Sequence, residues 1–291
     1  MLSIVIPTHN RPQTLQKAIS AYCSQTALQE ISEIVVIDDG STDSTSTVVN
    51  RMAKESVTPI RYIRQENKGP AAARNLGIRV AESPLILFTD DDIIPQHDLV
   101  AEHVKFHNAH AGESTAVLGF VTWLPDLAPT PFMDWYGSEV LFAFSKINAQ
   151  TEVDYRYFYT CNISLKKDFL LANGMFDEEF KVAAFEDIEL GFRLSKAGMR
   201  LFYNPQAVAY HEQFISFEDA CNRHQKSVAA AAIFGRRDAG RPCIDSLREP
   251  SSFTRHLKRL LAPVLSPVKP LVDCRIPLPW GLYRAMFRIY R

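Results

Sequence analysis

The sequence predicts an α/β fold in which a mainly parallel central sheet is flanked by helices. Short apolar runs alternate with segments of helical periodicity over the first 110 residues, a pattern typical of parallel strands joined by crossover helices. Each run is followed by polar or turn-forming residues, which end a strand. The length of 291 residues and the hydrophobic content of 46% allow a sizeable buried core. We therefore expect one large domain with an appendage.

The first half of the chain provides the parallel part of the sheet. Apolar runs predict four buried strands, at residues 2–6, 33–37, 60–63 and 85–88. Asn10 is the expected N-cap of the first helix, with Pro12 in its first turn, and Gly69-Pro70 begin the helix before the fourth strand. Because the carboxyl ends of parallel strands meet at one edge of a sheet, the polar residues after strands one, two and four should converge there.

The second half has a less regular pattern. Residues 122–156 combine prolines and tryptophans without a clear period, so we expect a long loop over the active site. Further strands are expected at 157–165 and 207–210, and further helices at 166–172, 185–194 and 217–231.

The acidic triplet Asp90-Asp91-Asp92 directly follows the apolar run 85–88. Three carboxylates at the end of a buried strand raise one another's pKa and lose hydration, so they need a counter-charge. Oxygen ligands in this pattern suit Mg²⁺ or Mn²⁺, which usually bind one or two carboxylates together with substrate phosphates. The alternative is an exposed acidic turn that caps a helix beginning near residues 96–98.

Six segments carry a family resemblance. They are SIVIPTHNR (3–11), IDDGSTD (37–43), NKGPAAARN (67–75), TDDD (89–92), GMFDEEF (174–180) and EDIEL (186–190). Each is a weak signal alone, but together and in this order they resemble the family 2 glycosyltransferases, which have the nucleotide-sugar-binding fold called glycosyltransferase A-type. The resemblance covers about residues 1–215.

The resemblance implies a site for a nucleoside-diphosphate sugar and a divalent Mn²⁺ or Mg²⁺ ion. The residues implied to hold the nucleotide-sugar are Pro7, Thr8, Asn10, Arg11, Asp38, Asp39, Arg74, Asp90 and Asp91. Within this set, Asp39 matches the base-binding residue and Asp90 the residue that faces the ribose. Asp90, Asp92 and His211 are the implied metal ligands. Asp187, with Glu186 beside it, matches the general base that deprotonates the acceptor hydroxyl.

Transfer from such a donor requires these groups. The departing diphosphate gains negative charge, which a divalent ion stabilises, and the attacking hydroxyl must lose its proton to a carboxylate. One base without a second nucleophilic carboxylate is typical of single displacement with inversion. Other interpretations stay open: Glu186 and Asp187 as first-turn acids of a helix, His211 as a half-buried histidine, and Arg74 as the partner of a nearby acid. Cys161-Asn162 departs from the family pattern of a small residue before Asn.

Two other protein classes compete with the glycosyltransferase. A sugar-phosphate nucleotidyltransferase needs a glycine-rich loop after the first strand, whereas residues 7–11 contain no glycine. A non-catalytic nucleotide-sugar- or glycan-binding module would tolerate loss of the acids, all of which are present. The acceptor is expected to be a glycan or a lipid-linked molecule, as in polysaccharide or cell-envelope synthesis.

We expect a catalytic domain at 1–235, a linker at 236–252 and a basic extension at 253–291. The nucleotide-sugar half of the catalytic domain is 1–121 and the acceptor half is 122–235. Residues 251–291 contain eight Lys/Arg and only Asp273 as an acid, although the whole chain has a net charge of −1. This overall balance argues against a nucleic-acid partner.

The basic extension predicts contact with an anionic membrane surface. Trp280, Tyr283 and Phe287 recur at helical spacing beside arginines, as do Leu257, Leu260, Leu261 and Val264. The alternatives are packing on the protein itself and a homodimer. Five scattered cysteines indicate neither a zinc site nor disulfides. Without a signal peptide or a spanning apolar run, the expected location is cytoplasmic, peripheral on the inner face of the membrane.

Overall fold

The computed structural model describes residues 1–147, 151–236, 261–263 and 265–291. The chain divides into two compact units. The first consists of Met1–Thr122 and Lys146–Glu212, and the second of Trp123–Ser145 and Gln213–Arg291. Residues 237–252, most of the predicted linker, lie outside the described residues, as do Leu257, Leu260 and Val264 of the predicted tail stripe.

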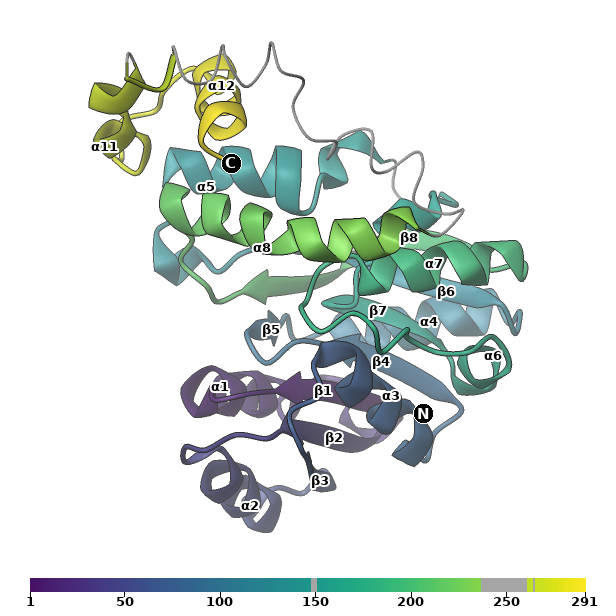
Figure 1. The fold of residues 1–291 in the computed structure, drawn as a ribbon. Coiled ribbons are helices and arrows are strands. Elements are labelled where there is room, and N and C mark those ends of the chain that lie inside the picture. Colours follow the sequence, from purple (N-terminus) through teal and green to yellow (C-terminus); the bar gives the residue numbers. More distant parts are fainter. Residues whose placement is uncertain (148–150, 237–260, 264) are drawn as a thin grey trace. The chain divides into compact units, whose positions relative to one another are not determined.

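The first unit contains an eight-stranded sheet with the order β3-β2-β1-β4-β7-β6-β8-β5 (Figure 1). Its strands are β1 (Leu2–Thr8), β2 (Ile31–Asp39), β3 (Ile60–Gln65), β4 (Leu85–Thr89), β5 (Ile93–Pro95), β6 (Thr115–Trp123), β7 (Asn162–Lys166) and β8 (Arg200–His211). The four strands predicted in the first half are parallel to one another. β7 pairs antiparallel with both β4 and β6, and β5 pairs antiparallel with β8. The predicted α/β fold is thus confirmed, with its parallel strands on one side of the sheet.

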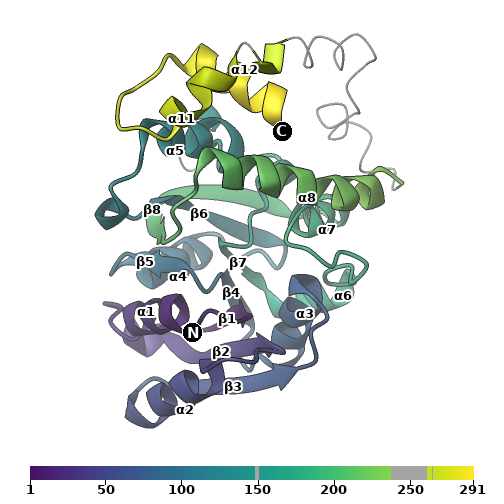
Figure 2. The same ribbon diagram turned by 60° about the vertical axis from the view of Figure 1, so that its left-hand side comes forward.

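Helices cover both faces of this sheet. Those of the first unit are α1 (Pro12–Tyr22), α2 (Thr45–Glu55), α3 (Pro70–Val80), α4 (Leu99–Ala109), α6 (Lys167–Ala172) and α7 (Glu186–Lys196). Figure 2 shows α1 and α4 on one side of the strands and α3 and α6 on the other. The small residues of α3 let it lie close to β1: a Cβ on Gly77 would come 2.3 Å from Val5 Cγ1.

Three local expectations need correction. Arg11, not Asn10, is the N-cap of α1, because Asn10 has a left-handed φ of 54° and its side chain instead accepts the N–H of Thr42. β7 begins at Asn162 rather than at 157. The segment 122–156 is not one long loop, since it contains α5 (Pro131–Tyr136) and the π-helical turn Gly137–Leu141.

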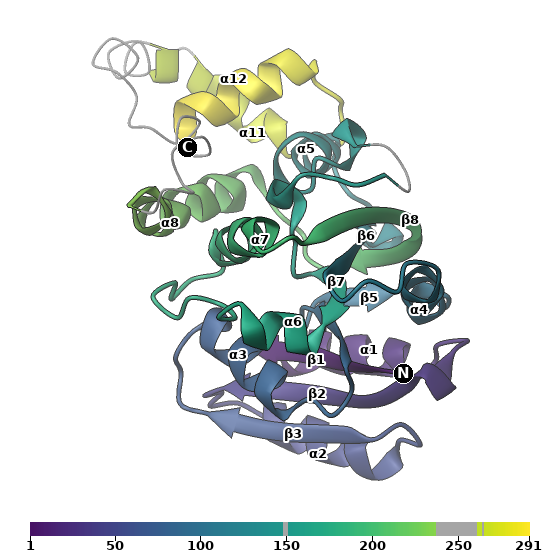
Figure 3. The ribbon, with the colours of Figure 1, turned by 90° about the vertical axis from the view of Figure 1, so that its right-hand side faces the viewer.

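The second unit has an aromatic core, which explains why the part of the segment 122–156 that belongs to it showed no period. α8 (Phe217–Gly235), α11 (Lys269–Val272) and α12 (Trp280–Tyr290) join α5 in this unit. α12 lies beside α5 (Figure 3). The ring of Tyr283 lies 5.9 Å from that of Trp135, and the ring of Phe287 lies 5.6 Å from that of Tyr136. Aromatic side chains from separate segments therefore bury one another, which needs no sequence period.

The predicted membrane-facing stripe of the tail is mostly internal. Tyr283 and Phe287 are 0% and 3% exposed, whereas Trp280 is 51% exposed. Two of the three aromatic residues therefore pack on the protein itself, which was the alternative to membrane contact. No helix in the described part of the chain is both long and apolar enough to span a membrane.

Candidate active site

The predicted site lies where the sheet reverses its strand order. β1 lies between β2 and β4, and ligands of open α/β sheets bind outside the strand ends at such a switch point. Thr8 ends β1 in register with Asp38 of β2, and the acidic triplet follows β4. The hydroxyl of Thr8 donates to Asp91 Oδ2 at 2.7 Å. The segments after strands one, two and four therefore converge as expected.

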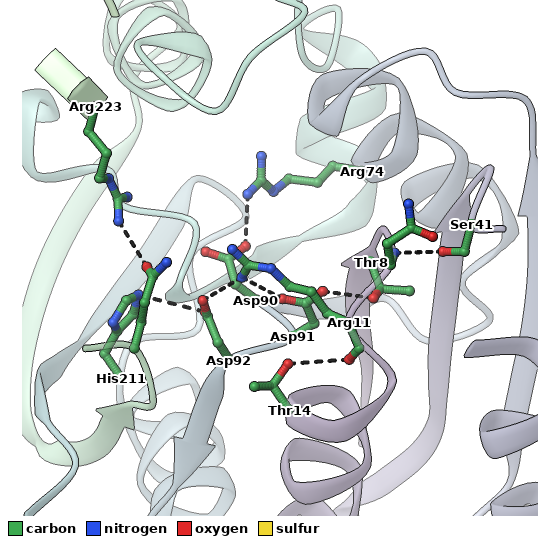
Figure 4. A network of polar contacts seen from close by, with 12 residues as sticks. Thr8, Arg11, Thr14, Ser41, Arg74, Asp90, Asp91, Asp92, His211 and Arg223 are labelled. Carbon is green, nitrogen blue, oxygen red and sulfur yellow. Dashed lines mark hydrogen bonds and ion pairs between the residues drawn. The ribbon is translucent and has the colours of Figure 1, made fainter. Parts of the chain in front are cut away.

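Two arginines form ion pairs with the acidic triplet (Figure 4). Arg11 Nη1 lies 2.6 Å from Asp92 Oδ2 and 3.2 Å from Asp91 Oδ1. Arg74 Nη2 donates to Asp90 Oδ1 at 2.8 Å. Burial and the neighbouring Asp92 nevertheless raise the pKa of Asp91 to about 7, although Arg11 opposes the shift. Three carboxylates thus share two arginines, one of which, Arg74, also pairs with Glu186.

The acidic triplet does not cap a helix, so that alternative is wrong. β5 separates the triplet from α4, and the N-cap of α4 is Asp98. The side chain of Asp98 accepts a hydrogen bond from Thr26 instead.

Asp92 and His211 form the pair of predicted metal ligands that the structure brings together. His211 Nε2 lies 3.7 Å from Asp92 Oδ1, and the backbone N–H of Glu212 donates to the carbonyl of Asp92 at 2.7 Å. Among the described residues, no three His, Cys, Asp or Glu side chains are grouped to hold a metal. A carboxylate oxygen and an imidazole nitrogen fit a divalent ion whose other ligands are substrate phosphates and water. Asp90 is the less direct candidate, since it is paired with Arg74.

The other side of the site is formed by the start of α7. Glu186 is 2% exposed and accepts from Arg74 Nη1 at 2.9 Å, which confirms that Arg74 pairs with nearby acids. Asp187 is half-buried and accepts the N–H of Ile188. Burial, and then the charge of Glu186, raise the pKa of Asp187 to about 7. A carboxyl with this pKa can accept a proton near neutral pH.

Buried polar contacts fix α7 in place. Arg193 pairs with Glu189 and donates to the carbonyls of Asn173 and Met175. Asn75 of α3 binds both the N–H and the carbonyl of Phe176. The preceding Phe185 has a left-handed φ of 68°, which is costly for a bulky residue and is typical of functional sites. Asn75 and Arg193 were not among the predicted site residues, because the backbone groups that they bind lie 18 to 101 residues away in the sequence.

The predicted nucleotide-binding residues form an ordered rim at the ends of β1 and β2. Asp39 accepts three hydrogen bonds, from Gln65 and from the N–H groups of Lys68 and Gly69, at 2.7–2.8 Å. Asp38 accepts the N–H of Ser41 and the hydroxyl of Tyr62. These bonds hold the turns around the rim in one arrangement.

His9 and Asn67 belong to the same rim and were not predicted. His9 Nδ1 lies 2.9 Å from the carbonyl oxygen of Asp39, and Asn67 Nδ2 lies 3.4 Å from His9 Nδ1. The position of His9 between Thr8 and Asn10 is the signal that could have identified it. Pro7 lies within β1.

Cys161-Asn162 is the pair that departs from the family pattern. Asn162 supports the fold, whereas Cys161 lies near the acids of the site. Asn162 is 1% exposed and its side-chain amide donates to the carbonyl of Ala207. Its Oδ1 lies 2.9 Å from His103 Nε2. Cys161 is half-buried, and burial, followed by the charges of Asp90 and Asp187, raises the pKa of its thiol. Cys161 is therefore a neutral thiol beside the acids of the site.

Known proteins resemble the chain in sequence. The glycosyl transferase family 2 model matches residues 3–127. The validoxylamine A glucosyltransferase of Streptomyces hygroscopicus subsp. limoneus is 33% identical over 225 residues, which are 68% of this chain and 49% of that protein. The chondroitin synthase of Escherichia coli is 28% identical over 243 residues, 73% of this chain and 34% of that protein. The chain thus spans about half the length of these curated relatives or less.

Solved structures share the fold. The mannosyltransferase PcManGT from Pyrobaculum calidifontis has a TM-score of 0.63 at 17% identity, covering 99% of this chain and 85% of that one. S. aureus TarS has a TM-score of 0.59 at 20% identity, covering 99% of this chain and 88% of that one. At these identities the likeness establishes the fold alone. Together with the ordered motifs and the sequence relatives, it leads to one conclusion: the chain belongs to glycosyltransferase family 2.

Proposed function

We propose that the chain transfers a sugar from a nucleoside-diphosphate sugar to an acceptor hydroxyl by single displacement with inversion, using Mn²⁺ or Mg²⁺. The observation that carries this proposal is the double ion pair of Arg74. One guanidinium binds Asp90 of the triplet at 2.8 Å and Glu186, the neighbour of Asp187, at 2.9 Å. The side chain of Arg74 therefore bridges Asp90, which is proposed to bind the donor, and Glu186, which precedes the proposed base Asp187.

Six residues of the site have distinct roles in the proposed reaction. Asp39, with Thr8 and Asn10, holds the nucleotide at the rim of β1 and β2. Asp92 and His211 hold the divalent ion, which, when bound, stabilises the negative charge of the departing diphosphate. Asp187 accepts the proton of the acceptor hydroxyl as that oxygen attacks the anomeric carbon.

Asp187 suits the role of base better than Glu186. Glu186 is engaged by Arg74, whereas no cation in the described chain lies within ion-pair distance of Asp187. The raised pKa of Asp187 gives it affinity for a proton near neutral pH. Glu186 and the acids of the triplet all form ion pairs with arginines, which leaves Asp187 as the candidate for a single base and supports single displacement.

The relatives suggest classes of donor and acceptor. One curated relative is named a chondroitin synthase, and solved neighbours are in complex with GDP-Man and Mn²⁺ or with UDP-GlcNAc. We propose that the acceptor is a glycan or a lipid-linked molecule of polysaccharide or cell-envelope synthesis, and that the donor is a GDP- or UDP-sugar.

A nucleotide-release assay tests the proposed function. We expect a panel of UDP- and GDP-sugars with Mn²⁺ to yield free nucleoside diphosphate, faster when a hydroxyl acceptor is present. A matching donor at 100 times its dissociation constant should also stabilise the protein by about 2.7 kcal/mol in a thermal-shift measurement. Release of pyrophosphate from a nucleoside triphosphate would instead identify a nucleotidyltransferase. Stabilisation without any turnover would identify a binding module.

We also propose that the C-terminal segment contacts an anionic membrane from the inner face, by a set of exposed residues that shares only Trp280 with the predicted stripe. Leu271, Ile276 and Trp280 lie within ten residues of one another and are 49%, 71% and 51% exposed. Basic side chains accompany them at positions 269, 275, 284 and 288, with Asp273 as the one acid between 265 and 291. Exposed apolar and aromatic groups beside basic residues are typical of interfacial membrane binding.

Vesicle co-sedimentation tests this contact. At low salt, the full chain should pellet with vesicles containing anionic lipid and not with neutral ones, and Ile276→Asp should reduce the pelleted fraction. Leu171→Asp, which changes a leucine that is 42% exposed on α6, is the matched control and should pellet as the parent does. Equal pelleting of Ile276→Asp and parent would refute the contact. A doubled mass by light scattering without pelleting would indicate a homodimer instead.

A further inference from the structure

We infer that Arg11 is an internal cation that occupies the proposed metal position until a divalent ion displaces it, and that it then binds the donor diphosphate. This inference rests on the proposed function. It concerns how the site is assembled, and it assigns Arg11 two successive partners.

The two arginines of the site are held very differently. Arg74 is buried and clamped between Asp90 and Glu186, with a side chain that is 4% exposed. Arg11 stands at the N-cap of α1 with a side chain that is 45% exposed, while the carboxylates it binds are 8% and 7% exposed. Both of its ion pairs use the same nitrogen, Nη1. Arg11 can therefore leave into solvent without disturbing the core, whereas Arg74 cannot.

The nitrogen of Arg11 engages an oxygen of the carboxylate that is proposed to bind the divalent ion. Nη1 is 2.6 Å from Asp92 Oδ2, and Mg²⁺ lies at about 2.0–2.1 Å from a carboxylate oxygen. Two cations cannot share this position, because like charges at such separations repel strongly. A metal ion that binds this oxygen of Asp92 must therefore displace the guanidinium, so the affinity measured for the metal includes the loss of that ion pair.

The displaced guanidinium has a second partner when the donor is present. Its planar set of donors matches phosphate oxygens, and its backbone remains anchored beside the triplet at the end of β1. The same residue thus opposes metal binding in the free protein and favours diphosphate binding in the metal-loaded protein. These opposite effects distinguish this role from simple support of the fold.

Binding measurements on Arg11→Gln test both halves. With Mn²⁺ alone, followed by electron paramagnetic resonance of the free ion, the variant should bind Mn²⁺ about fivefold more tightly than the parent, the factor expected for an exposed ion pair. With saturating Mn²⁺, calorimetry should show that the variant binds UDP or GDP roughly tenfold more weakly, the usual worth of a hydrogen bond to a charged group.

Two control variants accompany the test. Arg11→Lys keeps the charge and should stay closer to the parent than Arg11→Gln in Mn²⁺ affinity. Arg51→Gln removes the same charge from α2, where Arg51 donates to Gln16, and should change neither affinity.

The outcomes separate this inference from the proposed function. If the parent binds Mn²⁺ and Arg11→Gln binds it equally or more weakly, the inference about Arg11 is wrong and the proposed metal site stands. If Arg51→Gln matches Arg11→Gln, the effect is general electrostatics and the inference is again wrong. If the parent binds no Mn²⁺ with or without UDP and GDP, the proposed metal dependence fails, and this inference fails with it.

Discussion

Asp187→Asn should reduce sugar transfer by roughly 10²–10⁴-fold, the usual contribution of general base catalysis, while binding of donor and Mn²⁺ is retained. Asparagine has nearly the same shape as aspartate but cannot accept the acceptor's proton. The change lies at the second residue of α7, away from the nucleotide rim at β1 and β2. Turnover and donor affinity measured side by side check the prediction.

The pH dependence of kcat/KM provides a second test of Asp187 as the general base. Asp187 acts as a base only when ionised, and burial and Glu186 raise its pKa to about 7. The ratio kcat/KM of the parent should therefore fall as the pH decreases through about 7, and this acidic limb should be absent from Asp187→Asn. An acidic limb near the ordinary pKa of a carboxylate, about 4, would contradict the assignment.

Asp168→Asn is the matched control for Asp187→Asn. Asp168 also occupies the second position of a helix, α6, and is exposed. If Asp187 only supports its helix dipole, both variants should lose a similar 0.3–1 kcal/mol or so of stability and neither should lose transfer. Transfer at the parent rate by Asp187→Asn would make Glu186 the next candidate for the base.

The second large effect is expected for Asp92→Asn, which should remove most of the Mn²⁺ dependence of nucleotide binding. The amide cannot supply the charged oxygen that a hard divalent ion prefers. We expect metal affinity to fall by at least about 10–100-fold, the loss usual for residues that only orient a metal ligand. Calorimetric titration of UDP and GDP with and without Mn²⁺ measures it.

Asp98→Asn controls for loss of an acid near the acidic triplet. Asp98 is exposed at the N-cap of α4 and binds Thr26, so its replacement should leave the Mn²⁺ dependence intact. Unchanged Mn²⁺ dependence in Asp92→Asn itself would show that Asp92 is not a ligand.

The sequence by itself determined the parallel half of the sheet and the edge that carries the site. The apolar run 85–88 is buried in β4, and residues that follow a parallel strand can only lie at its carboxyl end. The segments that held Thr8, Asp38, Asp39 and the acidic triplet could therefore be brought together from local pattern alone.

The boundaries and the second unit were less predictable. Local propensity favoured Asn10 as a cap, yet its side chain bonds with Thr42 after β2. The segment 122–156 showed no period because its aromatic residues bury against α8 and α12, which are distant in sequence. The hydrophobic period of a sequence indicates which residues share a face of one helix. It does not indicate which other segment covers that face.

Only the tertiary structure decided which charges meet. Arg74 binds Glu186, which lies 112 residues further along the chain, and Arg11 binds Asp91 and Asp92, 80 and 81 residues away. Tyr283 and Phe287 are buried although Trp280, from the same predicted stripe, is exposed. This difference, too, depends on the packing of distant segments. The physical reason is common to all three cases: a residue type specifies what partner a side chain needs, but packing of distant segments specifies which partner lies within reach.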